Sequence, residues 1–251
     1  MAEKLTPEKI EEAAKYYEDI TSGKTPILDK DESFKQEQPK ILDSQARPIH
    51  KDMHEHLKKK DPNAFPLIPP SDPRLLMKIA PYTDDMLKEF NMKDRVELSK
   101  KMYNSMVKYG GIGLSANQVG LPFRMFVAGG HPELERGMAI AMYNPVIKSI
   151  SDDTTMLKEG CLSFPFIFLA IKRPKDVVMS YTDTNGKEQE AHLKGLMARV
   201  CLHEYDHMQG KVFTEHASKM KLDMAKKKAT KMMRMVEKRK QPTEIGDIDA
   251  K

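Results

Sequence analysis

The segment Cys201–Gly210 (CLHEYDHMQG) constrains this chain more than any other. It contains His203-Glu204-Tyr205-Asp206-His207, in which the two histidines are four residues apart. On a helix this spacing places both imidazoles on one face, where they can bind one metal ion while Glu204 reaches the water that the ion binds. Metal binding lowers the pKa of water to about 7, and a carboxylate can then shuttle its proton as hydroxide attacks a carbonyl. Two solvated histidines on a helix would show the same pattern. Other motifs are therefore needed to distinguish a metal site from solvated histidines.

Two upstream motifs can complete such a site. A catalytic metal site usually has three protein ligands and one open coordination position. Glu159-Gly160-Cys161-Leu162-Ser163 contains one of the two cysteines of the chain, and Gly111–Gly120 (GIGLSANQVG) is a Gly-rich loop with an amide side chain at Gln118. A thiolate is a suitable third ligand beside two imidazoles.

Taken in order, Gly-Ile-Gly-Leu-Ser-Ala-Asn-Gln, Glu-Gly-Cys-Leu-Ser and His-Glu-Tyr-Asp-His resemble the three motifs of the peptide deformylase family. That family removes the formyl group from the initiator methionine of new bacterial, organellar or phage-directed proteins. Asp72–Leu76 (DPRLL) and Met208–Phe213 (MQGKVF) are also similar to family segments, and the resemblance spans Phe65–Phe213.

The resemblance implies one metal ion, held by Cys161 as a thiolate and by His203 and His207 as neutral imidazoles. Fe(II) is expected from the family, and nickel, cobalt or zinc are possible. The ligand set alone would have suggested zinc.

The resemblance also assigns the chemistry and the substrate, a formyl-methionyl nascent peptide. Glu204 would act as general base and then as general acid. The Gln118 side chain and the Leu162 backbone N–H would stabilise the oxyanion. The following residues match the substrate-binding positions of the family: Gly111, Ile112, Gly113, Leu196, Val200 and the ring of His203. Each of those that would line the apolar pocket could simply be a core residue.

Some residues depart from the family pattern. Ser115 stands where Ala is usual, Asn117 where Pro is frequent, and Leu202 where Gln is usual. The run Phe164–Phe168 is more aromatic than the polar stretch commonly found there. Glu159 is expected to orient the motif loops, with an ordinary surface carboxylate as the alternative.

Two other functions are considered. A metallopeptidase with the His-Glu-x-x-His motif would usually take its third ligand downstream, where His216 is the candidate. A non-catalytic, ribosome-associated homologue predicts damage at Cys161, Glu204 or Gln118, and all three are intact.

We predict three parts. Residues 1–63 form a polar N-terminal extension with one helix that has Thr6 as N-cap. This extension could wrap the catalytic domain, contact a partner, or do neither. Residues 64–215 form the catalytic domain, and residues 216–251 form a basic C-terminal helix and tail.

The predicted fold class is α+β, with small antiparallel or mixed sheets around a central metal-binding helix. Apolar periodicity predicts helices over Lys93–Tyr109 and Gly195–Met208. Asp183–Gly186 is predicted to be a hairpin turn. The predicted strands are Phe123–Ala128, Ala139–Lys148, Phe166–Lys172, Val177–Thr182 and Lys187–Leu193.

The C-terminal part concentrates positive charge. Lys219–Lys240 holds ten Lys and Arg residues against two acidic ones, while the whole chain has a net charge of only +5. An apolar stripe at helical spacing accompanies them: Leu222, Ala225, Ala229, Met232, Met233 and Val236. The helix could pack this stripe on the domain and be solvated outside. Family members carry a comparable helix that docks on the ribosome, so Lys219–Lys240 is also a candidate for rRNA contact. A membrane-surface helix fits the charge too, but no bulky aromatic anchor follows Phe213.

The remaining composition favours a cytoplasmic protein. Two cysteines, one of them a metal ligand and Cys201 a buried thiol, do not make a disulfide framework. No apolar run approaches the ~18 residues of a membrane span, and the acidic N-terminus lacks a signal-peptide core. The sequence does not indicate an oligomeric state.

Overall fold

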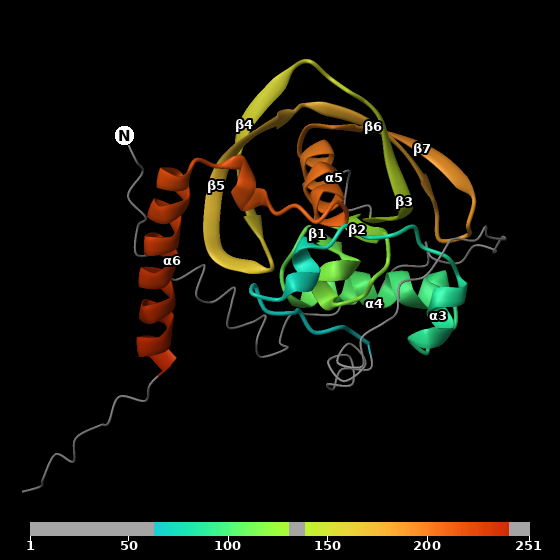
Figure 1. Ribbon diagram of the computed structural model, residues 1–251, viewed down its shortest axis with the longest axis horizontal. Helices are drawn as coiled ribbons and strands as arrows, with labels where there is room; N and C mark the ends of the chain where they lie inside the picture. Colours follow the sequence, from blue (N-terminus) through green and yellow to red (C-terminus); the bar gives the residue numbers. More distant parts are fainter. Residues whose placement is uncertain (1–62, 131–138, 241–251) are drawn as a thin grey trace, which may run out of the picture.

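Residues 63–130 and 139–240 are described by the structure, a computed structural model; for residues 236–240 only the backbone is described. The helix predicted near Thr6 lies outside these residues. Figure 1 shows the described elements, which follow one another along the chain as η2 (Pro73–Leu76), α3 (Asp85–Glu89), α4 (Arg95–Lys108), β1 (Gly113–Ser115), η3 (Ala116–Val119), β2 (Met125–Gly129), β3 (Ala139–Ile150), β4 (Thr154–Cys161), β5 (Phe164–Pro174), β6 (Asp176–Thr182), β7 (Glu188–Lys194), α5 (Gly195–Met208), η5 (Phe213–His216) and α6 (Lys219–Lys240).

Two antiparallel sheets make up the β structure. The larger sheet has the strand order β1-β2-β3-β6-β7, and the smaller one is the β4-β5 hairpin. Every strand pair in the described residues is antiparallel, so the prediction of an α+β fold with small sheets is confirmed, and the mixed alternative is not needed. The β6-β7 turn includes Gly186 with a φ of 71°, a backbone conformation that glycine adopts without strain.

Helix α5 is buried on most of its circumference. Its side chains Ala198, Val200 and Cys201 pack in one cluster with Phe126 of β2 and Met179 of β6. On another side, α5 contacts β5, so that it lies between the two sheets (Figure 1). A helix enclosed in this way needs apolar or paired side chains almost all round. The predicted bounds, Gly195–Met208, are those observed.

Helix α4 packs against β1, which lies within the Gly-rich segment Gly111–Gly120. Asp94 caps it by accepting a hydrogen bond from the backbone N–H of Glu97 at 2.8 Å. Its buried side chains Leu98, Met102 and Met106 pack in the same core cluster as Leu114 of β1. The predicted helix Lys93–Tyr109 is confirmed, two residues shorter at its start and one at its end.

Strand β4 was not predicted. Its apolar side chains Met156 and Leu157 are both exposed, so the sequence lacks the alternation that marks a half-buried strand. The strand forms because it pairs along its length with β5, from Thr154 opposite Pro174 to Cys161 opposite Phe164.

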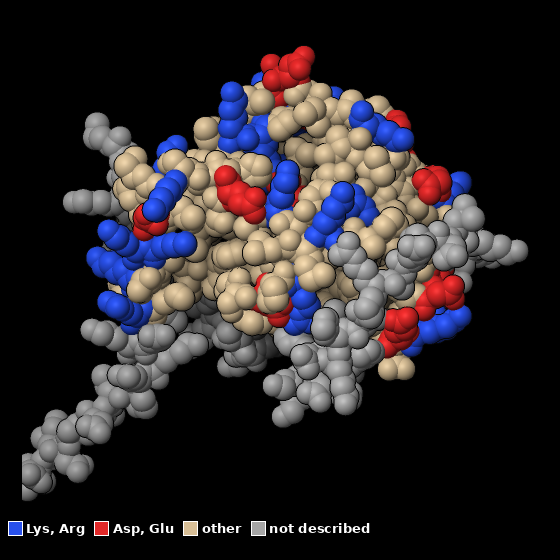
Figure 2. Space-filling model, in the orientation of Figure 1, with Lys and Arg blue, Asp and Glu red and all other residues tan. Residues whose placement is uncertain are grey.

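Helix α6 packs on β5 through part of the predicted stripe. Leu222 and Ala225 contact the cluster that contains Leu169 and Ile171, and Ala229 is buried. Met233 is 38% exposed, and the side chain of Val236 lies outside the described residues. Lys and Arg side chains gather along α6 on the face that Figure 2 shows. Within residues 63–130 and 139–240, no helix is long and apolar enough to span a membrane.

Candidate active site

The structure brings Cys161, His203 and His207 together. Cys161 ends β4, and the two histidines follow one another by one turn on α5. One ligand atom from each of the three lies within 4.8 Å of the others. The Cys161 Sγ atom is 3.3 Å from the Nε2 atom of His207. A thiol and two imidazoles converging on one point make a typical donor set for a divalent transition metal.

A buried ionic cluster holds His203. Glu159 of β4 is 6% exposed, which excludes the surface-carboxylate alternative. Its Oε2 atom is 3.1 Å from the Nδ1 atom of His203, and it accepts hydrogen bonds from Arg173 at 2.6 and 3.0 Å and from Arg199 at 2.6 Å. Burial alone would raise the pKa of Glu159, but its hydrogen bonds to His203 and Arg173 outweigh this and hold it at about 2. Glu159 therefore stays ionised and fixes the orientation of the His203 ring.

The electrostatics of the two histidines fit a bound cation. Burial, with His203 and Arg173 nearby, lowers the pKa of His207 well below its usual value, so its imidazole is neutral, the form that binds metals. Burial also lowers the pKa of His203, but hydrogen bonds to Cys161 and Glu159 outweigh it and raise the value to about 10. Surroundings that favour a proton on His203 favour positive charge at this point, and a divalent ion supplies such charge. The residues present therefore fit a metal ion.

Glu204 lies beside the three candidate ligands and is 4% exposed. Ser115 Oγ donates a hydrogen bond to its Oε2 atom at 2.9 Å. Burial raises the pKa of Glu204 to about 7, a value suited to a group that both takes and returns a proton near neutral pH. Gly113 makes room for this carboxylate, because a Cβ atom there would collide with Glu204 Oε1 and would lie 2.7 Å from Val200.

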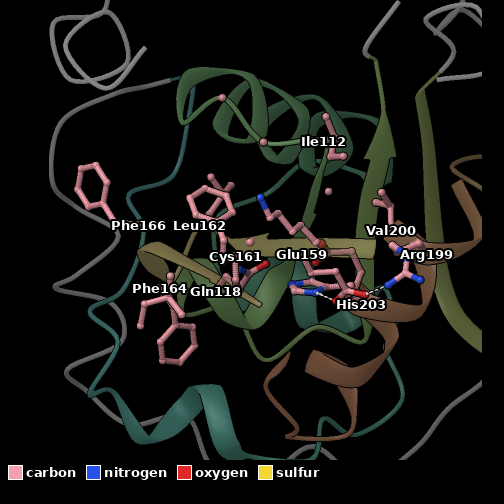
Figure 3. Close-up of a pocket in the computed structure, with 18 of the residues that line it drawn as sticks. Ile112, Gln118, Glu159, Cys161, Leu162, Phe164, Phe166, Arg199, Val200 and His203 are labelled. Carbon is pink, nitrogen blue, oxygen red and sulfur yellow. Dashed lines mark hydrogen bonds and ion pairs between the residues drawn. The ribbon is translucent and has the colours of Figure 1, made fainter. Parts of the chain in front are cut away.

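The side-chain amide of Gln118 points toward Cys161. Its Nε2 atom is 3.3 Å from Cys161 Sγ and donates to Ser163 Oγ at 3.0 Å. The residue is 1% exposed, so this amide is held in a fixed orientation. Leu162 lies at the same end of the cavity as Cys161 in Figure 3.

A cavity of ≈ 260 Å³ opens onto these groups. Figure 3 shows Ile112 and Val200 at one end and the aromatic rings of Phe164 and Phe166 at the other. All five predicted substrate-binding residues line it, as do Glu204, Gln118, Leu162, Cys161 and His203, whereas His207 does not. The remaining lining residues are Gly110, Lys158, Glu159, Gly160, Phe164, Phe166, Ile167, Phe168, Arg199 and Met232.

Several side chains at the site escaped sequence reasoning. Arg199 is buried and lies four residues before His203 on α5, a spacing that could have indicated a shared face. Ser163 belongs to the motif Glu159–Ser163 and Met232 to the apolar stripe of Lys219–Lys240, but neither pattern places them at the site. The β4-β5 turn brings Ser163 to Gln118, and the packing of α6 brings Met232 to the cavity.

Other residues lie away from the three candidate ligands. Cys201 is a free, fully buried thiol whose pKa burial raises, as expected for a core cysteine. Leu202 packs in the core around α5. His216 Nε2 is 2.9 Å from Asp206 Oδ2, and in the described part of the chain it does not join Cys161, His203 and His207. The metallopeptidase alternative therefore lacks its downstream ligand.

Comparison with known protein families matches residues 66–223 to polypeptide deformylase. The chain belongs to the polypeptide deformylase family. Peptide deformylases are hydrolases that remove the formyl group from N-formyl-methionyl peptides, and this chain is an enzyme of that class.

Similar proteins agree with this assignment. A peptide deformylase of Wolbachia sp. subsp. Brugia malayi is 37% identical over 178 residues, which cover 66% of this chain and 99% of the relative. The crystal structure of a peptide deformylase from Ehrlichia chaffeensis has a TM-score of 0.59 at 32% identity and covers 68% of this chain and 98% of its own. A class I type b peptide deformylase from Acinetobacter baumannii, solved with Met-Ala-Ser bound, has a TM-score of 0.57 at 27% identity and covers 61% and 98%.

Proposed function

We propose that this enzyme removes the N-formyl group from the initiator methionine of nascent polypeptides, with Glu204 and Gln118 as its catalytic side chains. One observation carries the proposal. A buried carboxylate and a fixed amide donor line the same cavity as Cys161 and His203, two of the three candidate ligands. This combination suits hydrolysis of an amide through a tetrahedral oxyanion.

Cys161, His203 and His207 would hold one divalent ion, with Fe(II) expected and nickel, cobalt or zinc as alternatives. When bound, such an ion lowers the pKa of water and polarises a carbonyl oxygen. The family implies the choice of iron, and the ligand set is compatible with each of these metals.

The side chains of the enzyme supply proton transfer and oxyanion stabilisation. Glu204 takes a proton from the attacking water and later delivers it to the departing amine. The Gln118 Nε2 group and the Leu162 backbone N–H donate hydrogen bonds to the oxygen that becomes negative. With the ion bound, His203 and His207 would be neutral imidazoles, and Glu159 fixes the orientation of the His203 ring.

The cavity accommodates the start of a peptide. Ile112, Leu196 and Val200 would form the pocket for the methionine side chain, and the bare backbone at Gly111 and Gly113 allows the peptide to lie close as an added strand. The Met-Ala-Ser bound to the relative from Acinetobacter baumannii supports a tripeptide as a test substrate.

Formate release from formyl-Met-Ala-Ser tests the proposal. The protein is purified anaerobically and loaded in parallel with Fe(II), Ni(II) or Zn(II), with the unformylated peptide as a control for proteolysis. Formate with an intact Met-Ala bond is expected. Peptide cleavage without formate would identify a metallopeptidase. Release of neither formate nor cleaved peptide with any of the three metals would overturn the proposed function.

For the C-terminal helix we propose contact with ribosomal RNA, in the cytoplasm where formyl-methionyl chains are made. Lys226, Lys227 and Lys228 are exposed on α6, and its inner side packs on β5. Neutralising phosphates with such a row gives binding that falls steeply with salt. Replacing the three lysines with glutamine should reduce ribosome co-sedimentation. Unchanged co-sedimentation, also after deletion of residues 219–251, would exclude this contact.

A further inference from the structure

Ser115 links the two catalytic side chains. It ends β1 and is fully buried, and it does not line the cavity. Its hydroxyl oxygen is 2.9 Å from Glu204 Oε2 and 3.0 Å from Gln118 Oε1. Its backbone N–H donates a hydrogen bond to Gln118 Oε1 at 2.9 Å. One residue thus contacts the carboxylate through its side chain and the amide through both its side chain and its backbone.

The donors and acceptors in this group can be assigned. A backbone N–H only donates, so the Gln118 atom facing it is the carbonyl oxygen, and the amide nitrogen faces Ser163 and Cys161. The Ser115 hydroxyl has a single proton. When Glu204 is ionised, its carboxylate accepts more strongly than a neutral amide that already has a donor, so this proton goes to Glu204.

The hydroxyl holds one carboxylate oxygen and leaves the other available. Gly113 lines the cavity and lies beside Glu204 Oε1, whereas Ser115 contacts Oε2. Among the described residues, Ser115 makes the side-chain hydrogen bond of Glu204. Without it, a buried carboxylate would lose its donor and could rotate about its last bond.

We propose that Ser115 is a positioning residue, which fixes the Glu204 carboxylate and the Gln118 amide relative to each other for the reaction. The inference rests on the proposed function. Ser115 stands where the family usually has alanine, so the hydroxyl contact depends on this chain rather than on the motif.

Such positioning affects turnover more than binding. In the proposed mechanism Glu204 and Gln118 act on the proton and the oxyanion of the transition state, whereas the proposed methionine pocket would bind substrate and transition state equally. A hydrogen bond to a charged group is worth about 1.5–3 kcal/mol, which corresponds to about 10- to 100-fold in rate. Ser115→Ala should therefore lower kcat by about 10- to 100-fold and leave KM nearly unchanged.

The experiment compares wild type, Ser115→Ala and Ser115→Thr with a matched control, Ser99→Ala. Ser99 is equally buried and also hydrogen bonded through its hydroxyl, to Tyr143 at 2.8 Å, and it does not line the cavity. Readouts are kcat and KM for formyl-Met-Ala-Ser, metal content by mass spectrometry, and the urea midpoint of unfolding. Threonine keeps the hydroxyl, so it should restore part of kcat.

A double-mutant cycle identifies the partner through which Ser115 acts. In a Glu204→Ala background, Ser115→Ala should cause little further loss of kcat, because the carboxylate that the hydroxyl holds is already absent and the alanine variant keeps the backbone N–H that Gln118 accepts from. Metal content should stay at the wild-type level in all variants, since Ser115 does not contact the three candidate ligands.

Separate outcomes overturn separate claims. If wild type releases no formate with any metal, the proposed function fails and this inference fails with it. If wild type is active and Ser115→Ala keeps the wild-type kcat, whether or not its KM changes, the positioning role alone is wrong. The same holds if Ser115→Ala and Ser99→Ala lose kcat in parallel with their unfolding midpoints, because the effect would then be structural.

Discussion

Glu204 is the residue on which the proposed chemistry depends most directly. It lies one residue after His203 and is not among the three candidate ligands. Glu204→Ala should therefore bind metal as wild type does and lose about 10²- to 10⁴-fold in turnover, the usual contribution of a general acid–base group. Formate release and metal content measured on the same preparations check this. Near-wild-type activity would show that another group moves the proton.

Phe166 has an unusual backbone conformation at the cavity wall. Its φ of 64° lies in the left-handed region, which costs an L-residue with a side chain about 1–2 kcal/mol. Phe166→Ala removes the ring and keeps the strain, whereas Phe166→Gly removes both. The glycine variant should be the more stable by about 1 kcal/mol, the reverse of the usual order. Urea unfolding of both variants measures the difference, and a more stable alanine variant would contradict the strain.

At the residue scale, sequence reasoning named four residues that the structure brings close together. His203 and His207 follow from the helical repeat, and Cys161 and Gln118 from their motifs. Arg199 and Ser115 were not given a role, because their contacts with Glu159 and Glu204 join segments 40 and 89 residues apart. No local pattern encodes such pairings.

Among the elements, β4, β5 and α5 are joined by one buried cluster of charges. Glu159 of β4 meets Arg173 of β5 and Arg199 of α5, and Arg173 also pairs with Asp206 at 2.8 Å. Removing one member of a buried ion pair destabilises a protein much more than replacing both members with apolar residues, because the partner charge stays buried without compensation. The cluster therefore makes the position of Cys161 depend on the position of the helix that holds both histidines.

Glu159→Gln should destabilise the protein and weaken its metal site together. Two buried guanidinium groups would lose their carboxylate, a change that typically costs about 3–5 kcal/mol. His203 would lose its ionised partner, with about 10- to 100-fold lower metal affinity. Urea unfolding and metal titration measure the two effects.

Asp153→Asn is the matched control for this prediction. Asp153 pairs with Lys175 at 3.1 Å, but its side chain is 79% exposed, so the free energy of unfolding should change by less than about 0.5 kcal/mol. Equal effects of the two substitutions would contradict the role given to the buried cluster.

Prediction of the elements succeeded where one periodic pattern dominates. Helices α4 and α5 have long repeats with clear ends, and the β6-β7 hairpin has its Asn-Gly turn. Strand β4 was missed because its pairing with β5, rather than its own apolar alternation, makes it a strand. Strand β5 begins at Phe164, two residues before the predicted start, for the same reason.

For the whole molecule, the structure joins α6 to the hydrolase fold through one side of β5. Leu222 and Ala225 complete the cluster around Phe213, and Met232 reaches the cavity wall. The sequence predicted the helix and its stripe but not the surface that the stripe covers. Residues 1–63 remain a proposed extension, and the division at residue 216 remains a proposal as well.

Deletion of residues 219–251 should lower the thermal stability of the enzyme more than its kcat. The deletion exposes the outer side of Leu169 and Ile171, and each buried aliphatic side chain contributes about 1.5–3 kcal/mol. The two side chains together give about 3–6 kcal/mol, and at about 2–4 °C per kcal/mol for a chain of this size Tm should fall by roughly 6–24 °C. The residues proposed for catalysis lie outside the deleted segment, so kcat at a temperature well below Tm should change little.

The triple variant Lys226→Gln, Lys227→Gln, Lys228→Gln separates packing from charge. These side chains are exposed, and the substitutions leave the apolar stripe of α6 intact. Its Tm and kcat should match those of wild type, whereas the deletion variant should have a lower Tm. A deletion variant with wild-type Tm would show that α6 does not stabilise β5 in solution, and a large loss of kcat would show that the wall containing Met232 takes part in turnover.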